Sequence, residues 1–225
     1  MIALLEEHCD YDPYCVGGKM YSIMNIYYDT PDQNIISRSI YKPNGIYKEK
    51  LRARSYVGGK TRFLEIKKKY DGVVGKRRIK LTSEELNALI DKGTLPEEKS
   101  FTDKQILKEI QYFISQYPGL KPNVFLAYDR LGFADKIDPG LRITFDENIR
   151  CSRDQFNWEE VDDAKPLLPK GIYILEIKTS NPYPLWLAKY LSEEGIYHHS
   201  FSKYGTEYKK YLKEKHYELI PELYI

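Results

Sequence analysis

The sequence has few of the residues that disulfide frameworks and Cys–His metal centres require. It holds three cysteines, Cys9, Cys15 and Cys151, and four histidines. An odd cysteine count without a CxxC pair argues against a disulfide framework and fits a reducing compartment. The histidines do not combine with the cysteines at a metal-ligand spacing. The sequence therefore predicts neither a disulfide framework nor a Cys–His metal centre.

Long apolar runs and a strong charge imbalance are also missing. No stretch approaches the roughly 20 apolar residues that span a bilayer, and in MIALLEEHCD acids follow a very short apolar run, unlike a signal peptide. We expect a soluble, cytoplasmic protein, which a membrane or another partner protein could still engage. The formal net charge is only +2. Basic surface must therefore be local, and no general nucleic-acid footprint is indicated.

The composition does allow a sizeable core. Hydrophobic residues make up 42% of the 225-residue chain, and 21 tyrosines outnumber 8 phenylalanines. Tyrosine favours half-buried strands. The length suits one large domain or two small ones, and no convincing boundary divides the sequence. We therefore expect a single domain over residues 1–225.

Turn signals and periodicity predict an α+β fold, an antiparallel meander with inserted helices. Turns are expected at Asn44-Gly45, Gly58-Gly59 and Asp71-Gly72. Expected strands cover 21–30, 46–56, 62–70, 73–81, 123–133, 140–150 and 172–180. Expected helices cover about 2–9, 83–93, 103–116, 184–194 and 203–215, the third with a stripe of Ile106, Ile110, Phe113 and Ile114.

The turns also predict a hairpin register. Asp71-Gly72 favours a two-residue loop, which places Lys67 opposite Lys76 and Glu65 opposite Arg78. A two-residue loop at Gly58-Gly59 would place Arg52 opposite Glu65 and Arg54 opposite Phe63. Directly opposed residues share a face of the sheet. One face then carries Arg52, Arg54, Glu65, Lys67, Lys69, Lys76 and Arg78.

Two interpretations of this face stay open. On a solvated face the long cationic side chains simply reach into water. In a closed barrel with apolar faces turned outward, the cations would line the interior and need an anion such as phosphate. Later strands repeat the pattern, because charged or polar residues share one parity in each strand. These residues are Tyr128 with Arg130, Arg142 with Thr144 and Asp146, and Glu176 with Lys178.

Two further residues have alternative roles. Glu176 could form a salt bridge, or it could supply hard oxygen ligands to Mg²⁺ or Mn²⁺ shared with phosphate. Ser202 could cap the last helix, or with Lys203 it could form a phosphate site at the helix start.

Seven motifs in order resemble a known family, the polyphosphate polymerase domain of the vacuolar transporter chaperone complex. That family belongs to the triphosphate tunnel metalloenzymes, with the CYTH-type cyclases and triphosphatases. The motifs are YYDTP (27–31), KEKLRARSY (48–56), FLEIKKKYDGVVGKRR (63–78), YDR (128–130), LRITFD (141–146), ILEIK (174–178) and SFSKYG (200–205).

The resemblance implies an antiparallel tunnel or barrel of about eight strands with helices packed outside. It implies metal-dependent transfer of the ATP γ-phosphate to a growing polyphosphate or pyrophosphate acceptor, with Mn²⁺ or Mg²⁺. Glu176 would hold the metal. The substrate would also lie beside Glu65, Tyr128, Lys178 and Ser202. The implied phosphate-binding residues are Arg52, Arg54, Lys67, Lys69, Lys76, Arg78, Arg130, Arg142 and Lys203.

One departure leaves alternatives open. Relatives begin with a charged strand and a helix, whereas this sequence starts within or after that helix, so the first tunnel strand is expected to be missing. The alternatives are a tripolyphosphatase or cyclase of the same superfamily, a non-catalytic polyphosphate- or nucleotide-binding module, and a β-rich scaffold with solvated charged faces.

Overall fold

A computed structural model describes residues 1–41, 47–97, 99–158 and 164–215 of the chain. The chain divides into two compact units. Unit 1 comprises Met1–Ile23, Ala127–Arg150 and Leu168–Phe201, and unit 2 comprises Met24–Leu126, Cys151–Leu167 and Ser202–Ile225. The expectation of a single domain stays a prediction. The predicted Asn44-Gly45 turn lies outside the described residues.

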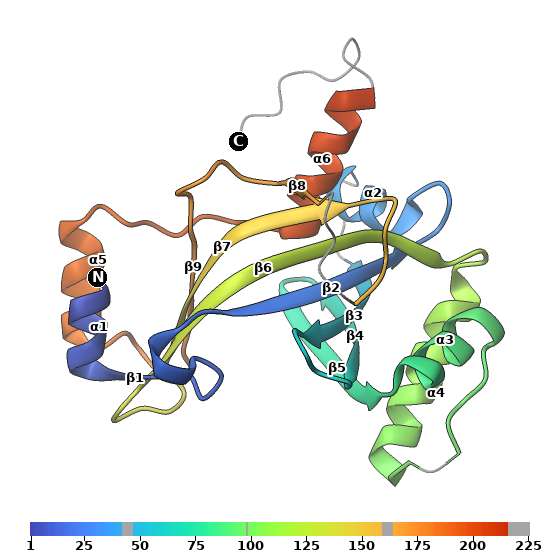
Figure 1. Cartoon of the computed structure of the whole chain (residues 1–225), viewed down its shortest axis with the longest axis horizontal. Helices are drawn as coiled ribbons and strands as arrows, with labels where there is room; N and C mark the ends of the chain where they lie inside the picture. Colours follow the sequence, from blue (N-terminus) through green and yellow to red (C-terminus); the bar gives the residue numbers. More distant parts are fainter. Residues whose placement is uncertain (42–46, 98, 159–163, 216–225) are drawn as a thin grey trace. The chain divides into compact units, whose positions relative to one another are not determined.

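Runs of antiparallel strands are interrupted by helices, as in an α+β fold, which confirms the predicted class (Figure 1). The described strands form a sheet in the order β5-β4-β3-β2-β6-β7-β8, with β1 paired to β6 and β9 to β7. It has nine strands, where the resemblance implied about eight. The turn signals predicted seven of them, and the short β1 and β8 were not predicted. The strands are β1 (Cys9–Tyr11), β2 (Tyr21–Asp29), β3 (Tyr47–Tyr56), β4 (Arg62–Tyr70), β5 (Val73–Leu81), β6 (Lys121–Asp135), β7 (Arg142–Ser152), β8 (Lys165–Pro166) and β9 (Ile174–Lys178).

The helices confirm the predicted segments and add one. They are α1 (Ile2–His8), α2 (Asn34–Tyr41), α3 (Ser83–Lys92), α4 (Phe101–Gln116), α5 (Leu185–Glu193) and α6 (Lys203–Lys215), with a short 3-10 helix, η1, at Val16–Gly18. Thr82 caps α3 in a capping box with Glu85, and Gly93 ends the helix at φ 67°. The stripe expected on α4 is partly wrong, since Leu107, Ile110 and Phe113 are its buried residues.

In unit 2, the hairpins β3–β4 and β4–β5 have the predicted register. Lys67 pairs with Lys76, Glu65 with Arg78, and Arg52 with Glu65. Asp71 and Gly72 both have positive φ, 42° and 84°, as a two-residue type I′ turn requires. The other turn is wider than expected, since β3 ends at Tyr56 and β4 begins at Arg62.

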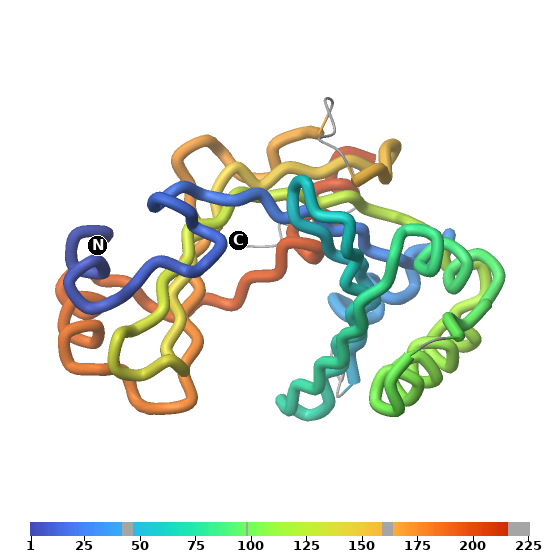
Figure 2. The backbone as a smooth tube through the Cα atoms, turned by 60° about the horizontal axis from the view of Figure 1, so that its bottom comes forward, coloured from blue at the N-terminus to red at the C-terminus, as the bar shows by residue number. Residues whose placement is uncertain are grey.

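One face of these three strands is buried and the other carries the charges. The buried face holds Leu51, Ala53, Leu64, Ile66 and Ile79, each at most 2% exposed. Figure 2 shows the β4–β5 hairpin in teal with the green helices α3 and α4 beside it. Because side chains alternate along a strand, burying these residues turns the arginines and lysines to the opposite face.

Unit 1 has its own core, in which α1 and α5 contribute beside the ends of β6 and β7. Leu5, Phe133, Ile143 and Leu187 belong to this cluster and are at most 2% exposed. The rings of His8 and Trp186 stack with centroids 4.4 Å apart. This packing holds the unit 1 parts of β6 and β7, whose polar faces carry the second group of candidate residues.

Helix α2 was not predicted, and Asp29 just before it organises its start. Its carboxylate accepts hydrogen bonds from the backbone N–H groups of Thr30, Ile35 and Ile36 at 2.8–3.0 Å. It therefore neutralises the N-terminal end of a helix that begins at Asn34. The predicted strands 140–150 and 172–180 are also displaced or too long, because β7 runs to Ser152 and β9 covers only Ile174–Lys178.

Candidate functional site

The charged face of unit 2 is built by three neighbouring strands, and we call it the cation face. Rows of directly opposed residues cross it: Lys48, Lys69 and Val74; Lys50, Lys67 and Lys76; Arg52, Glu65 and Arg78. Arg54 and Lys80 lie opposite Phe63, on either side of it. Glu65 is the only acid that these three strands place on this face. The lysines and arginines therefore greatly outnumber the acids.

Glu65 holds the centre of the cation face together. Its carboxylate is 1% exposed and lies 2.7 Å from Arg52 Nε and 2.8 Å from Lys76 Nζ. Arg78 Nη1 is further away, at 3.9 Å. Burial by itself would raise the pKa of Glu65, but the positive charges of Arg52, Arg54 and Lys76 more than offset it and lower the pKa to about 2. Glu65 is therefore ionised at every physiological pH and positions its cations.

Strand β2 supports the two arginines from the side. Arg54 Nε donates to Asn25 Oδ1 at 3.2 Å, and Arg52 Nη1 donates to the Tyr27 hydroxyl at 3.3 Å. Burial would raise the pKa of Tyr27, but the charges of Arg52 and Lys50 outweigh it and lower that pKa. The guanidinium groups are thus held in fixed directions by neutral oxygen acceptors as well as by Glu65.

Helix α6 brings Ser202 to the cation face. Lys50 Nζ donates to Ser202 Oγ at 2.9 Å, and the same oxygen accepts from the backbone N–H of Gly205 at 3.1 Å. Ser202 therefore caps the helix and also contacts a cation, whereas the phosphate site expected with Lys203 stays a prediction. Lys203 is the first residue of α6 and is half-buried. Burial, joined by the nearby cations Lys67 and Arg52, lowers the pKa of Lys50.

A second polar group lies in unit 1, and we call it the Arg130 cluster. Arg130 Nε and Nη2 donate to the two oxygens of Asp146 at 2.6 and 2.8 Å. Asp146 is fully buried and Arg130 is 9% exposed. The Arg130 guanidinium also lies over the ring of Tyr128, 5.3 Å from its centroid. Burial would lower the pKa of Arg130, but the bonds to Asp146 raise it, so its charge is permanent.

Glu176 lies at the exposed side of the Arg130 cluster. Its carboxylate is 42% exposed, with Oε2 3.6 Å from Arg130 Nη2 and Oε1 3.1 Å from Lys178 Nζ. On the paired strand β7, Thr144 lies directly opposite Glu176, and the exposed Arg142 lies opposite Lys178. Arg142, Thr144, Glu176 and Lys178 therefore share one face of the β7–β9 pair.

The oxygen atoms of this cluster can supply part of the shell of ligands that a divalent metal needs. Among the described residues, no three Asp, Glu, His or Cys side chains are placed to hold a metal by themselves. Mg²⁺ commonly takes only one or two carboxylates and completes its shell with substrate phosphates and water. Glu176 offers such a half-exposed carboxylate, and Thr144 Oγ1 is buried without a hydrogen-bond partner in the described parts of the chain. Such an orphaned oxygen is typical of a site that a ligand completes, so the residues fit a metal shared with phosphate.

The structure thus places the predicted residues in two groups, one in each unit. Sequence reasoning missed two members of these groups, Lys48 and Lys50, although they have the same strand parity as Arg52. It placed Thr144 and Asp146 on one face with Arg142, but only their neighbours across the strands show what they contact. The groups are the cation face with Ser202 and Lys203, and the Arg130 cluster with Tyr128, Arg142, Glu176 and Lys178.

The sequence matches the family described as VTC domain over residues 1–212, and the chain belongs to that family. No curated protein matches it. A proposed adenylate cyclase from Bacillus halodurans is similar in structure, with 13% identity, a TM-score of 0.49, and coverage of 81% of this chain and 79% of that one. A proposed adenylyl cyclase from Hippeastrum, described as having a dominant triphosphatase activity, shows 15% identity, a TM-score of 0.45, and coverage of 99% and 91%. Likenesses at this level do not identify a reaction.

Among the described helices, none combines the length and apolar character that crossing a bilayer would need.

Proposed function

We propose that the chain is a metal-dependent polyphosphate polymerase, which transfers the γ-phosphate of ATP to a polyphosphate or pyrophosphate acceptor. The observation that carries the proposal is the cation face, where three lysines in one row and three arginines nearby share a single acid, Glu65. Like charges directly opposite one another on a sheet are destabilising. A phosphate chain would remove that cost, and its regularly spaced charges match rows of cations.

The membership in the VTC domain family supports the choice of phosphate chains over other anions. Phosphoryl transfer requires little covalent help from a protein, because alignment and charge stabilisation lower most of its barrier. Arg52 and Arg54 suit the alignment, since their directions are fixed by Glu65, Tyr27 and Asn25. Hydrogen-bond donors that are already fixed need little reorganisation when the substrate binds. They stabilise the charge that spreads over the transferred group.

The lysines of the cation face suit a different task. Lys67, Lys69 and Lys76 are exposed, and an ammonium group binds phosphate as a point charge without demanding one geometry. They can therefore hold a chain of varying length and let it advance. Removal of a proton from the acceptor needs no side chain, because a terminal phosphate oxygen is already largely ionised at neutral pH.

Mn²⁺ or Mg²⁺ would be held by Glu176, with Thr144 Oγ1 close to it on the paired strand. A metal held there would supply positive charge that offsets the charge of the phosphate groups. Arg130 supplies a permanent charge beside Glu176, because it stays ionised in its buried pair with Asp146. Glu176 itself remains accessible. Lys178 and Arg142 add positive charge on the same face and suit contacts to the substrate.

The proposal is tested by incubating the chain with ATP and Mn²⁺ and separating the products on a polyacrylamide gel stained for polyphosphate. A ladder that lengthens with time, and that Arg52→Ala abolishes, supports a polymerase. Free phosphate from tripolyphosphate, or cyclic AMP, would instead assign the hydrolase or cyclase activity. Salt-sensitive binding of triphosphate without turnover would leave a binding module, and neither binding nor turnover would leave a scaffold.

A further inference from the structure

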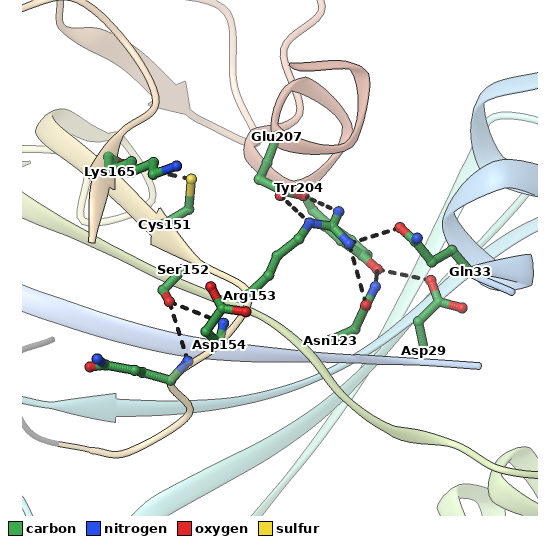
Figure 3. Close-up of polar contacts among 11 residues, drawn as sticks. Asp29, Gln33, Asn123, Cys151, Ser152, Arg153, Asp154, Lys165, Tyr204 and Glu207 are labelled. Carbon is green, nitrogen blue, oxygen red and sulfur yellow. Dashed lines mark hydrogen bonds and ion pairs between the residues drawn. The ribbon is translucent and has the colours of Figure 1, made fainter. Parts of the chain in front are cut away.

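Unit 2 contains a cavity, lined by several charged residues, that the proposed reaction does not use. Its volume is about 700 Å³, and it lies among the ends of β6 and β7, the short strand β8 and helix α6. Figure 3 shows the polar side chains of this region around Arg153. The basic residues that line it are Lys121, Arg153, Lys165, Lys210 and Lys215, and the acidic ones are Asp154, Glu207 and Glu214.

Arg153 gives the cavity a rigid wall. Its Nε and Nη2 donate to the carboxylate of Glu207 at 2.7 and 2.8 Å, and its Nη1 donates to Gln33 Oε1 at 2.9 Å. The guanidinium lies 3.6 Å from the ring centroid of Tyr211. A bidentate, stacked arginine of this kind is fixed in place. Its charge is also cancelled by Glu207, so Arg153 shapes the cavity while the lysines supply its net positive charge.

The four lysines are placed to receive an anion. All are exposed, and Lys121, Lys165 and Lys215 form no ion pair with another residue that the structure describes. Lys210 Nζ donates to the carbonyl of Pro166 at 3.0 Å, which keeps it beside β8. With the Arg153–Glu207 pair neutral, four lysines face only two acids, Asp154 and Glu214.

Ser152 adds a hydroxyl donor to this surface. Its oxygen already accepts from the backbone N–H groups of Asp154 and Gln155 at 3.2 and 3.3 Å. The hydroxyl hydrogen is therefore left to donate toward a ligand. Lysines combined with a hydroxyl suit phosphate oxygens.

Helix α6 connects this cavity to the cation face within the same unit. Glu207 and Tyr211 contact Arg153, and one turn earlier Tyr204 donates to Asp29 Oδ2 at 2.8 Å and accepts from Asn123 Nδ2 at 2.9 Å. Asn123 Oδ1 in turn accepts from Arg153 Nη1 at 3.4 Å. At the helix start, the Ser202 cap accepts from Lys50 of the cation face.

We propose that this cavity is a regulatory site for a small phosphate-type polyanion, and that its occupancy is transmitted along α6 to the Ser202 end of the cation face. A ligand that draws the lysines together would shift β8 and the last turns of α6. The chain of hydrogen bonds from Arg153 through Asn123 to Tyr204 would carry that shift to the helix start. The role as a regulator rests on the proposed function, whereas the binding itself does not.

Binding is tested by calorimetric titration of inorganic pyrophosphate into the full chain carrying Arg52→Ala and Lys67→Ala, which weakens the cation face. We expect one site to remain, and the further pair Lys121→Ala and Lys165→Ala to weaken it about tenfold. The matched control, Lys104→Ala with Lys108→Ala on the exposed side of α4, should leave the affinity unchanged. Loss of all binding in the cation-face variant, or equal effects of the two lysine pairs, would overturn the site.

Repeating the titration with ADP separates the sources of the phosphate group, since tighter ADP binding would assign a nucleotide and tighter pyrophosphate binding an inorganic chain.

Transmission is tested by hydrogen exchange in the cation-face variant with and without pyrophosphate. Slower exchange in the first turns of α6, lost with Lys121→Ala and Lys165→Ala, supports it. Unchanged exchange in α6 would overturn the coupling. Because neither measurement depends on turnover, failure to form polyphosphate would leave both results interpretable.

Discussion

Lys67 and Lys76 lie directly opposite each other on β4 and β5, and Lys50 faces Lys67 from β3. Three like charges in one row across a sheet work against folding unless solvent screens them or an anion binds. Their mutual repulsion is the observation on which the proposed binding of a polyanion rests.

Replacing Lys67 tests that repulsion directly. We expect Lys67→Ala to leave the melting temperature of the free protein equal or slightly higher, because a repulsion worth about 0.2–1 kcal/mol is relieved. The increase in melting temperature on adding tripolyphosphate should become smaller. Lys68→Ala is the matched control, since Lys68 lies on the other face of the strand opposite Gly75. If both variants respond alike to tripolyphosphate, the face does not bind the chain.

The pH dependence of stability tests Glu65. Its pKa is lowered from 4.5 to about 2 in the folded chain, so ionised Glu65 stabilises the fold above pH 4.5 and this contribution is lost as the pH falls toward 2. Glu65→Gln lacks the contribution at every pH. The difference in melting temperature between the two proteins should therefore be largest above pH 5 and shrink toward pH 2. A difference that is independent of pH would show that the ion pairs of Glu65 do not support the fold.

The Arg130–Asp146 pair should behave as a buried charge pair. Asp146→Ala leaves the Arg130 guanidinium buried without its partner, which costs about 3–5 kcal/mol in the free energy of unfolding. The double variant Arg130→Met with Asp146→Leu should recover most of that stability, because no buried charge remains. Urea denaturation measures both values. A single variant that costs less than about 1 kcal/mol would mean that water reaches the pair.

Glu176 should matter for turnover and little for stability. Its carboxylate is 42% exposed, and exposed ion pairs contribute at most about 1 kcal/mol. We expect Glu176→Gln to lower metal-dependent turnover on the order of 100-fold, the scale for losing one preorganised charge-stabilising group. Glu193→Gln is the control, because it removes an exposed carboxylate that pairs with Lys189 in the same unit. Equal activities of the two variants would remove Glu176 from the site.

Local signals predicted the cation face well. The Asp71-Gly72 turn fixed the register of β4 and β5 because its backbone geometry permits only one pairing, and alternation along the strands then placed every charge. The Thr82 capping box and Gly93 fixed α3 in the same way. In these segments the information lies within a few residues of the chain.

Contacts between distant segments were beyond the sequence. Ser202 meets Lys50 and Asp146 meets Arg130 only after strands and helices have packed, and no pattern in either segment names the partner. The role of Asp29 at the start of α2 was missed for the same reason, since its carboxylate accepts hydrogen bonds from N–H groups six and seven residues away. The cavity around Arg153 likewise forms only where β7, β8 and α6 pack together, so sequence reasoning gave no hint of it.

The central claim is that γ-phosphate groups of ATP end up in a lengthening inorganic chain. Phosphorus NMR of a reaction with ATP and Mn²⁺, quenched with excess chelator at successive times, measures this directly, because internal phosphate groups resonate apart from terminal ones and from ADP. We predict that internal-phosphate signals grow in step with ADP, and that Glu176→Gln suppresses both while Glu193→Gln suppresses neither. Signals of free phosphate and ADP alone, without internal phosphates, would contradict the assignment as a polymerase.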